Sequence, residues 1–205
     1  MARAILIGGG DCNPSLLPKK RDDDLLIAAD SGLLVLRQAG REPDLCIGDF
    51  DSLGFQPPDA LVLPVRKDDT DLMAAARIAL ARGYRNFVLL GVLGGKRFSH
   101  SVAALQTLCF LAEEGAEAEI LDEHCRISVL RNATREYDET ATGLLSVFAM
   151  SGPVRVTLDG LSYPLPPTLL TTSYPLGVSN AFVGKKAKVT ADGGTLLLIE
   201  EPDAS

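Results

Sequence analysis

The chain has 205 residues, 46% hydrophobic and 23% charged, a composition that excludes a disordered protein and leaves room for one large or two small domains. Lys and Arg total 20 against 27 Asp and Glu, so the net charge of −7 argues against a nucleic-acid partner. The sequence has no apolar run of ~18 residues, and Gly8 to Gly10 interrupt the first apolar run before the ~7–15 residues of a signal-peptide core, so we expect a cytoplasmic protein with no membrane partner.

The first 130 residues alternate short apolar runs with helical patterns, which is typical of a parallel α/β sheet. Strands are predicted at residues 4–7, 25–29, 45–47, 61–65, 87–90 and 118–121. Helices are predicted at residues 33–39, 71–82 and 100–114, and each is followed by a glycine that can end it: Gly40, Gly83 and Gly115. This part is therefore expected to be an N-terminal α/β domain with a parallel, Rossmann-like sheet.

From about residue 127 the helical pattern disappears. Strands are predicted at residues 143–150, 154–158, 187–189 and 195–199, separated by turns rich in Gly, Pro, Asp and Ser. The Pro-rich residues 163–175 are expected to form a long ordered loop or an irregular strand. The organisation predicted is an α/β domain over residues 1–130 and a small all-β sandwich over residues 131–205.

Polar residues gather after several of the predicted parallel strands. Ligands of open α/β sheets bind at the carboxyl ends of the strands, where such residues would meet. The clusters cover residues 29–32, 43–52, 67–71 and 94–100.

Within Gly48-Asp49-Phe50-Asp51-Ser52, an extended backbone would point both aspartates to the same side. Two carboxylates together with phosphate oxygens and water suit Mg²⁺, which prefers hard oxygen ligands. A solvated acidic turn is the simpler interpretation of a lone pair of acids. The other clusters on the same predicted edge favour the magnesium site.

Lys67-Asp68-Asp69-Thr70-Asp71 comes directly before a predicted helix. Thr70 or Asp69 could simply cap that helix. A cap does not account for a lysine and three acids together. Asp71 could add a third carboxylate to a metal site, while the helix start faces a phosphate.

The segment from Gly91 to Arg97 resembles a P-loop only superficially, because three residues instead of four separate Gly91 from Gly95, and Arg97 stands where Ser or Thr is required. Gly8-Gly9-Gly10 likewise fails the dinucleotide G-x-G-x-x-G pattern. The second loop is still predicted to approach phosphates closely and to offer Lys96 and Arg97. His100, at the start of the next helix, is more often structural than catalytic in such a setting.

The cysteines carry no metal or redox pattern. They contain no C-x-x-C pair, and neither His100 nor His124 stands at a zinc-ligand spacing from them. We expect reduced, structural thiols at Cys12, Cys46, Cys109 and Cys125.

Taken together and in this order, the clusters resemble the thiamine pyrophosphokinase family. That family shows A-D-[GS]-G, P-D-x-x-x-G-D-x-D-S, K-D-x-T-D, a glycine loop ending R-x-D-H, and a late S-N-E-F-like segment. The matching residues here are 29–32, 43–52, 67–71, 97–100 and 179–182. The second and third motifs together are highly specific, and the family's architecture, an α/β domain followed by a β-sandwich, agrees with the pattern above.

The resemblance implies Mg²⁺-dependent transfer of pyrophosphate from ATP to the hydroxyethyl group of thiamine, giving thiamine diphosphate and AMP. Residues 1–130 would form the nucleotide-binding catalytic domain, and residues 131–205 a thiamine-binding and dimerisation domain. It also implies a homodimer with shared active sites.

The same resemblance implies a role for individual residues. Asp49, Asp51 and Asp71 would hold the metal, and with Arg97 would be catalytic. The ATP site would contain Asp30, Ser31, Lys67, Asp68, Thr70 and Arg97. Thiamine would meet Ser99, His100, Ser179 and Asn180. Asp71 or a metal-bound water would accept the alcohol proton, and the sequence does not decide between them.

The chain departs from the family pattern at two positions: Ser99 replaces an aspartate, after a glycine loop one residue longer through Lys96, and Ala181 replaces a glutamate. One alternative is therefore a related Mg²⁺-dependent pyrophosphokinase or nucleotide hydrolase that acts on another substrate. A second is a catalytically inactive relative that binds thiamine or a nucleotide, although such a protein would be expected to have lost the metal aspartates.

Overall fold

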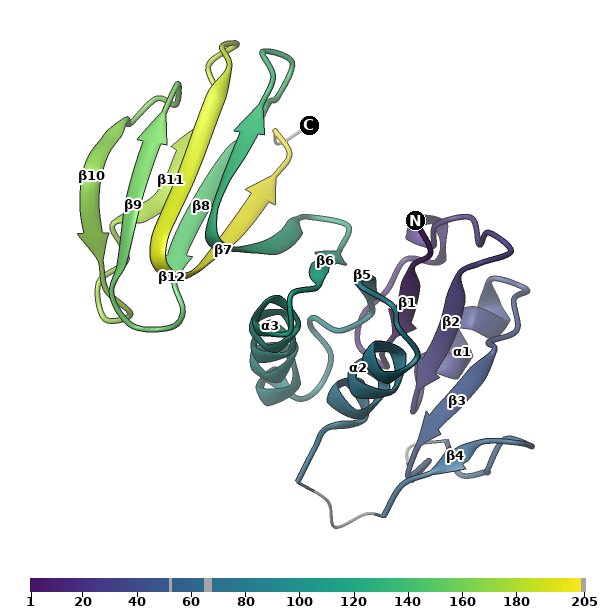
Figure 1. Cartoon of the computed structure of the whole chain (residues 1–205). Helices are drawn as coiled ribbons and strands as arrows, with labels where there is room; N and C mark the ends of the chain where they lie inside the picture. Colours follow the sequence, from purple (N-terminus) through teal and green to yellow (C-terminus); the bar gives the residue numbers. More distant parts are fainter. Residues whose placement is uncertain (52, 65–67, 204–205) are drawn as a thin grey trace. The chain divides into compact units, whose positions relative to one another are not determined.

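The structure, a computed structural model, describes residues 1–51, 53–64 and 68–203. The chain has a mixed α/β fold and divides into two compact units, Met1–Glu123 and His124–Ser205, each described by itself below (Figure 1). The boundary drawn from the sequence, after residue 130, falls inside the strand β7 (Arg126–Tyr137). Among the described residues, no helix is long and apolar enough to cross a membrane.

The N-terminal unit is built on a parallel sheet. Its strands lie in the order β6 (Glu117–Leu121), β5 (Asn86–Leu90), β1 (Ala4–Ile7), β2 (Leu25–Ala29), β3 (Leu45–Gly48) and β4 (Leu61–Val62). The central strands β1 and β2 are buried along their whole length, because the sheet has helices on both faces. This explains why they are continuous apolar runs rather than alternating ones.

In the part of the chain that the structure describes, three α-helices return the chain between the strands. They are α1 (Gly32–Gln38), α2 (Asp71–Ala81) and α3 (Phe98–Glu113), each within two residues of its predicted bounds. Leu33 and Leu36 of α1 pack with Ile5 and Ile7 of β1, while α2 and α3 contact each other; Figure 1 shows α2 and α3 in front of the sheet and α1 behind it. A short 3-10 helix, η1 (Pro14–Leu16), follows β1.

This topology decides where the polar clusters meet. The strands run parallel and the helices run back, so the ends of the strands and the starts of the helices share one edge of the sheet. The loops after β1, β2, β3 and β5 and the first turns of α2 and α3 therefore lie at the carboxyl edge.

The C-terminal unit is antiparallel throughout. Its strands are β7, β8 (Leu144–Ala149), β9 (Val154–Asp159), β10 (Leu165–Leu170), β11 (Gly177–Ala181) and β12 (Ala187–Glu201). The long strand β12 pairs with β7, with β9 over its first part and with β8 over its second. The core is aliphatic and includes Leu145, Val156, Val189 and Leu196.

Several strands of this unit differ from the prediction. The two strands predicted at residues 187–189 and 195–199 are one strand, because Gly193 and Gly194 form an irregularity in β12 rather than a turn. The partner strand β7, not predicted, accommodates it: Asn132 has a φ of 47° and its Oδ1 accepts a hydrogen bond from Gly194 N at 3.0 Å. The Pro-rich segment contains the irregular strand β10, which pairs with β9.

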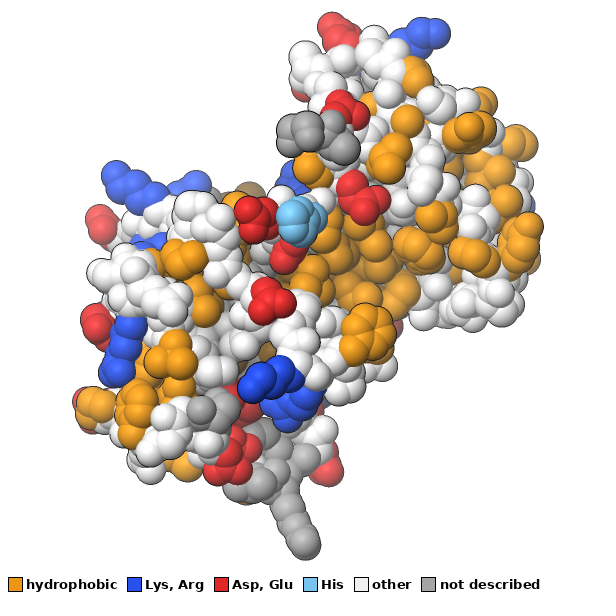
Figure 2. Space-filling model, turned by 180° about the vertical axis from the view of Figure 1, so that it is seen from behind, with side chains coloured by type: hydrophobic (Ala, Val, Ile, Leu, Met, Phe, Trp, Pro, Cys, Tyr) orange, Lys and Arg blue, Asp and Glu red, His pale blue; other side chains and the backbone are white. Residues whose placement is uncertain are grey.

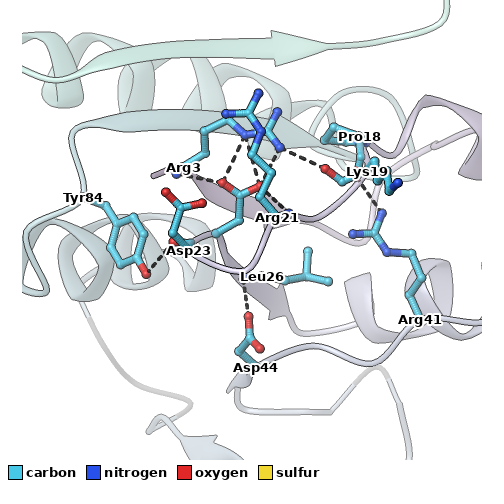
Figure 3. Close-up of polar contacts among 10 residues, drawn as sticks. Arg3, Pro18, Lys19, Arg21, Asp23, Leu26, Arg41, Asp44 and Tyr84 are labelled. Atoms are coloured by element: carbon cyan, nitrogen blue, oxygen red, sulfur yellow. Dashed lines mark hydrogen bonds and ion pairs between the residues drawn. The ribbon is translucent and has the colours of Figure 1, made fainter. Parts of the chain in front are cut away.

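A buried ion pair ties the amino ends of β1 and β2 together (Figure 3). The Asp24 side chain is fully buried and accepts hydrogen bonds from Arg3 N, Nε and Nη2 and from Arg21 N, at 2.5 to 3.2 Å. Asp44, the first acid of the P-D-x-x-x-G-D-x-D-S motif, accepts from Leu26 N at 2.7 Å and pairs with Lys20. Asp44 therefore joins β2 to β3 at the edge opposite the polar clusters.

Candidate active site

The loops at the carboxyl edge approach one another so closely that glycine is required. A Cβ added at Gly8 would lie 2.6 Å from Gly91 O, and one at Gly9 would lie 1.8 Å from Ser31 Oγ. At Gly48, which follows β3, a Cβ would lie 3.1 Å from the Cα of Asp30. The loops after β5, β1, β2 and β3 thus lie side by side in the order of the strands.

Asp30 and Ser31 occupy the turn between β2 and α1. Asp30 has a φ of 49°, and its N–H donates to Ile47 O at 2.8 Å, which continues the pairing of β2 with β3 beyond the strands. Ser31 precedes the first residue of α1 and packs against Gly9. The structure therefore brings these two residues beside the loop that carries Asp49.

The aspartates of the Gly-Asp-Phe-Asp segment lie in a turn, not in an extended strand as predicted. β3 ends at Gly48, and Phe50 has a φ of 59° with its side chain buried. Asp51 N donates to Asp49 Oδ1 at 3.2 Å, so the turn itself holds the two residues together. The buried Phe50 anchors the turn, while Asp51 is exposed to solvent.

The segment before α2 combines a helix cap with an ion pair. Thr70 Oγ1 accepts a hydrogen bond from Met73 N at 3.1 Å, which makes Thr70 the N-cap of α2. Asp69 pairs with Arg77 at 3.0 Å, and the Arg77 guanidinium lies 4.5 Å from the centre of the Phe110 ring. Asp71 is the first residue of α2 and Asp68 is exposed. Lys67, predicted for the ATP site, lies outside the described residues, as does Ser52 of the neighbouring motif.

The loop after β5 leads into α3. Gly94 and Gly95 have φ values of 67° and 73°, and Arg97 is the N-cap residue of α3. His100 N donates to Arg97 O at 2.9 Å, which closes the first turn of the helix. The side chains of Arg97, Ser99 and His100 are exposed, so all three are presented at the carboxyl edge.

The acidic side chains at this edge decide whether it can hold a metal ion. Within residues 1–51, 53–64 and 68–203, no group of three or more His, Cys, Asp or Glu side chains is close enough to hold one, so Asp49, Asp51 and Asp71 do not form a three-carboxylate cluster. The pair Asp49 and Asp51 still offers carboxylate oxygens, the ligand type of Mg²⁺, which commonly takes one or two carboxylates and completes its shell with phosphate oxygens and water.

Ser179 and Asn180, in β11 of the C-terminal unit, have different environments. Ser179 is exposed, has a φ of 56°, and its N–H donates to Ser146 Oγ at 3.0 Å. Asn180 is only 4% exposed, and its amide accepts from Tyr163 N at 2.8 Å and donates to Tyr163 O at 2.7 Å. The structure therefore presents Ser179 at the surface, whereas the Asn180 amide supports the chain at Tyr163.

Sequence reasoning missed Asp11, which lies in the loop after β1. Its carboxylate accepts a hydrogen bond from Gly95 N at 2.9 Å. The available signal was an acid directly after a strand and a run of glycines at the predicted carboxyl edge. Nearby Cys12 is half-buried, and burial, followed by the charge of Asp122, raises the pKa of its thiol, so it remains protonated at neutral pH.

Comparisons with known proteins agree along the length of the chain. Residues 19–120 match the family model "Thiamin pyrophosphokinase, catalytic domain", and residues 132–196 match "Thiamin pyrophosphokinase, vitamin B1 binding domain". The chain is 27% identical to the thiamine pyrophosphokinase of Bacillus subtilis (strain 168), over 97% of this chain and 98% of that protein.

Solved structures show the same likeness. The crystal structure of thiamine pyrophosphokinase from Bacillus subtilis superposes with a TM-score of 0.83 at 25% identity and covers 100% of both chains. That of thiamin pyrophosphokinase from Geobacillus thermodenitrificans superposes with a TM-score of 0.79 at 29% identity and covers 100% of this chain and 99% of that one.

Proposed function

Because the chain belongs to the thiamin pyrophosphokinase family, we propose that it transfers a pyrophosphoryl group from ATP to the hydroxyethyl oxygen of thiamine. The observation that carries this proposal is the match of both family models, in order, over residues 19–120 and 132–196. The relatives named above carry the same enzyme name, which favours this activity over another pyrophosphokinase, a hydrolase or an inactive relative.

Each unit takes one part of this function. The N-terminal unit is a Rossmann-like nucleotide-binding domain, which its parallel sheet and the glycine-lined loops at the carboxyl edge support. The C-terminal unit is a thiamine-binding β-sandwich, supported by its match to the vitamin B1 binding model and by its antiparallel strands.

In the reaction, the thiamine hydroxyl oxygen bonds to the β-phosphorus of ATP. The bond between that phosphorus and the oxygen bridging to the α-phosphate breaks, AMP leaves with the electron pair, and the alcohol proton passes to Asp71 or to water. Such a transfer depends on positioning and on neutralising the phosphate charge. Arg97, exposed at the first turn of α3, supplies a cation suited to phosphate oxygens.

The rest of the nucleotide site follows the loops of the carboxyl edge. It comprises Asp30, Ser31, Lys67, Asp68 and Thr70. The Thr70 hydroxyl already accepts a hydrogen bond from Met73 N, so its part is to fix the start of α2, where backbone N–H groups can face a phosphate. Asp30 and Ser31 lie beside the turn of Asp49 through the close approach at Gly48.

Asp49 and Asp51 are the residues that would hold Mg²⁺, with Asp71 near the phosphates. When bound, Mg²⁺ supplies neutralisation of the phosphate charge. The chain's own part is the turn at Phe50, which holds the two aspartates in one conformation before any ligand arrives.

Thiamine meets Ser99 and His100 of the N-terminal unit and Ser179 of the C-terminal unit, all of which are exposed. Asn180 acts on thiamine through the segment it supports at Tyr163, because its amide is engaged there on both sides. Ser99 offers a hydroxyl but no charge to a cationic substrate, which predicts weaker thiamine binding than an aspartate at the same place would give.

A homodimer with shared sites completes this assignment. The C-terminal unit carries exposed hydrophobic side chains that a second copy would cover, and Figure 2 shows hydrophobic side chains on the surface of this unit. The exposed hydrophobic side chains of the C-terminal unit are Leu144, Tyr163, Leu169, Tyr174, Leu176, Val178 and Val183.

The test is the identity of the products. Purified protein is incubated with ATP, Mg²⁺ and thiamine, and the products are identified by mass spectrometry. We expect AMP and thiamine diphosphate in equal amounts, because both phosphates move together. Thiamine monophosphate with ADP, or AMP formed without thiamine, would contradict the proposal.

A further inference from the structure

We propose that Asp11 is a positioning residue, whose carboxylate holds the glycine turn at Gly95 and thereby places Lys96 and Arg97 for the phosphates of ATP. This inference rests on the proposed function only for the role of Arg97. The anchoring itself is a property of the loops and can be measured without substrate.

The loops after β1 and β5 are joined beyond the ends of their strands. Gly8 N donates to Leu90 O at 2.8 Å, and Gly10 N donates to Gly91 O at 2.7 Å. Because β1 and β5 are parallel neighbours, their loops leave the sheet side by side and remain paired. Asp11 therefore lies next to the turn that follows β5.

Asp11 forms hydrogen bonds to that turn through both its backbone and its side chain. Its N–H donates to Leu93 O at 3.1 Å, and its Oδ2 accepts from Gly95 N at 2.9 Å. The two hydrogen bonds lie on either side of Gly94. A Cβ at residue 94 would lie 2.5 Å from Asp11 Oδ2, so the absence of a side chain there lets the carboxylate reach the turn.

The turn needs such an anchor because it is intrinsically adaptable. Gly94 and Gly95 have φ values of 67° and 73°, and glycine enters or leaves this region without steric cost. A hydrogen bond to a carboxylate is charge-assisted and is stronger than one between neutral groups. The hydrogen bond from Gly95 to Asp11 therefore restricts the turn at Gly94 and Gly95.

Fixing Gly95 fixes the cations, because the next residues lead directly into a rigid element. Arg97 is the N-cap residue of α3, and its carbonyl accepts from His100 N at 2.9 Å. Lys96 and Arg97 are thereby held between Asp11 on one side and the first turn of α3 on the other. Cations placed in advance lose less conformational entropy on binding phosphate.

The experiment compares Asp11→Ala, Asp11→Asn and the control Asp22→Ala, which removes an exposed acid from a different loop of the same unit. The first readout is amide hydrogen exchange of Gly95 without ligand. The second is the affinity for Mg²⁺ with a non-hydrolysable ATP analogue, and the third is the KM for ATP against the KM for thiamine.

For Asp11→Ala we expect faster exchange at Gly95, about tenfold weaker analogue binding and a similar rise in the KM for ATP, with the KM for thiamine unchanged. Asp11→Asn keeps an acceptor oxygen and should stay within about threefold of the wild type. The control should match the wild type. A purely structural role for Asp11 would lower thermal stability without separating the two KM values.

Besides that structural outcome, two results would overturn the inference. One is wild-type exchange at Gly95 and wild-type analogue binding in Asp11→Ala. The other is an Asp11→Asn variant that binds the analogue as poorly as Asp11→Ala while Gly95 remains protected, since that would make the charge and not the hydrogen bond responsible. If the wild type binds the analogue but leaves thiamine unchanged, the proposed function fails while the exchange and binding results still decide the role of Asp11.

Discussion

Replacing Asp24 by Asn should destabilise the N-terminal unit at neutral pH, by an amount that disappears in acid. The Asp24 side chain is fully buried, where Arg3 N, Nε and Nη2 and Arg21 N donate to it (Figure 3). An Asn at this position keeps one acceptor oxygen but turns an NH₂ group toward these donors. The guanidinium of Arg3 then loses its partner charge.

The lowered pKa of Asp24 gives the size of the expected loss in the free energy of unfolding. Burial alone would raise this pKa. The hydrogen bonds from the Arg3 guanidinium and from the N–H groups of Arg21 and Arg3 lower it by more than burial raises it, so the pKa falls from 3.8 to about 2. At ~1.4 kcal/mol for each pKa unit, the ionised form contributes roughly 2 kcal/mol to the free energy of unfolding. Breaking a buried ion pair costs about 3–5 kcal/mol in other proteins, so a loss of ~2–4 kcal/mol is expected at pH 7.

The sign of the pH dependence follows from the lowered pKa. Above about pH 4, Asp24 is ionised in both the folded and the unfolded chain, and its full contribution is present. As the pH falls from about 4 to about 2, the unfolded chain takes up a proton before the folded one does, and the contribution is lost. The difference in the free energy of unfolding between the wild type and Asp24→Asn should therefore become smaller as the pH falls over this range.

Urea unfolding followed by circular dichroism at 222 nm measures this difference, because α1, α2 and α3 all lie in the N-terminal unit. The control is Asp22→Asn, which removes the same charge from an exposed position two residues away and should change the free energy of unfolding by less than ~0.5 kcal/mol. If Asp24→Asn matched this control at pH 7, or if its deficit stayed constant down to pH 2, the account of the buried pair would be wrong.

Three of the remaining predictions concern the proposed reaction, and the last concerns the stability of the C-terminal unit. Asp51→Asn should lower kcat on the order of 10²-fold at limiting Mg²⁺ while the fold is retained. The matched control is Asp59→Asn, at an exposed turn where residue 59 has a φ of 57°, and this variant should keep the wild-type kcat. Equal rates in the two variants would show that Asp51 is not part of the metal site. Ser99→Asp should raise the apparent affinity for the thiamine cation severalfold and leave the KM for ATP unchanged in steady-state kinetics. An unchanged or weaker thiamine affinity would mean that the longer glycine loop places Ser99 away from thiamine. Mixing inactive Asp51→Asn chains with inactive Ser179→Arg chains should restore part of the activity, because a mixed dimer can assemble one intact site; no recovery despite verified subunit exchange would mean that each site is built from one chain. Tyr137→Phe should cost about 1 kcal/mol in urea unfolding, since the Tyr137 hydroxyl donates to Glu200 at 3.0 Å; an unchanged midpoint would show that this hydrogen bond contributes nothing net.

The sequence by itself determined the N-terminal unit closely. Strands β1 and β2 begin and end at the predicted residues, because buried parallel strands are short apolar runs that glycine or aspartate follows. The glycines after the helices likewise marked the ends of α2 and α3 to within a residue. Local composition is sufficient to predict these elements, because the residues that begin and end each strand or helix lie next to it in the sequence.

The candidate site was also largely readable from the sequence. The order of the strands, with β1 between β5 and β2, could not be read locally, but any parallel α/β sheet brings its loops to one edge. Residue types and spacing therefore selected the loops of Asp30, Asp49, Asp71 and Arg97 without knowledge of their neighbours. The family resemblance added the identity of the substrates.

Only the tertiary structure decided what several of these residues contact. The turn at Phe50, the hydrogen bonds between Asn180 and Tyr163, and the hydrogen bond from Gly95 to Asp11 join atoms through backbone angles or chain separations that no local pattern encodes. The same holds for β7 and β12, where Asn132 meets Gly194 across the pair and turns an expected loop into a bulge. Such contacts exist because distant segments fit together, so side-chain chemistry alone does not reveal them.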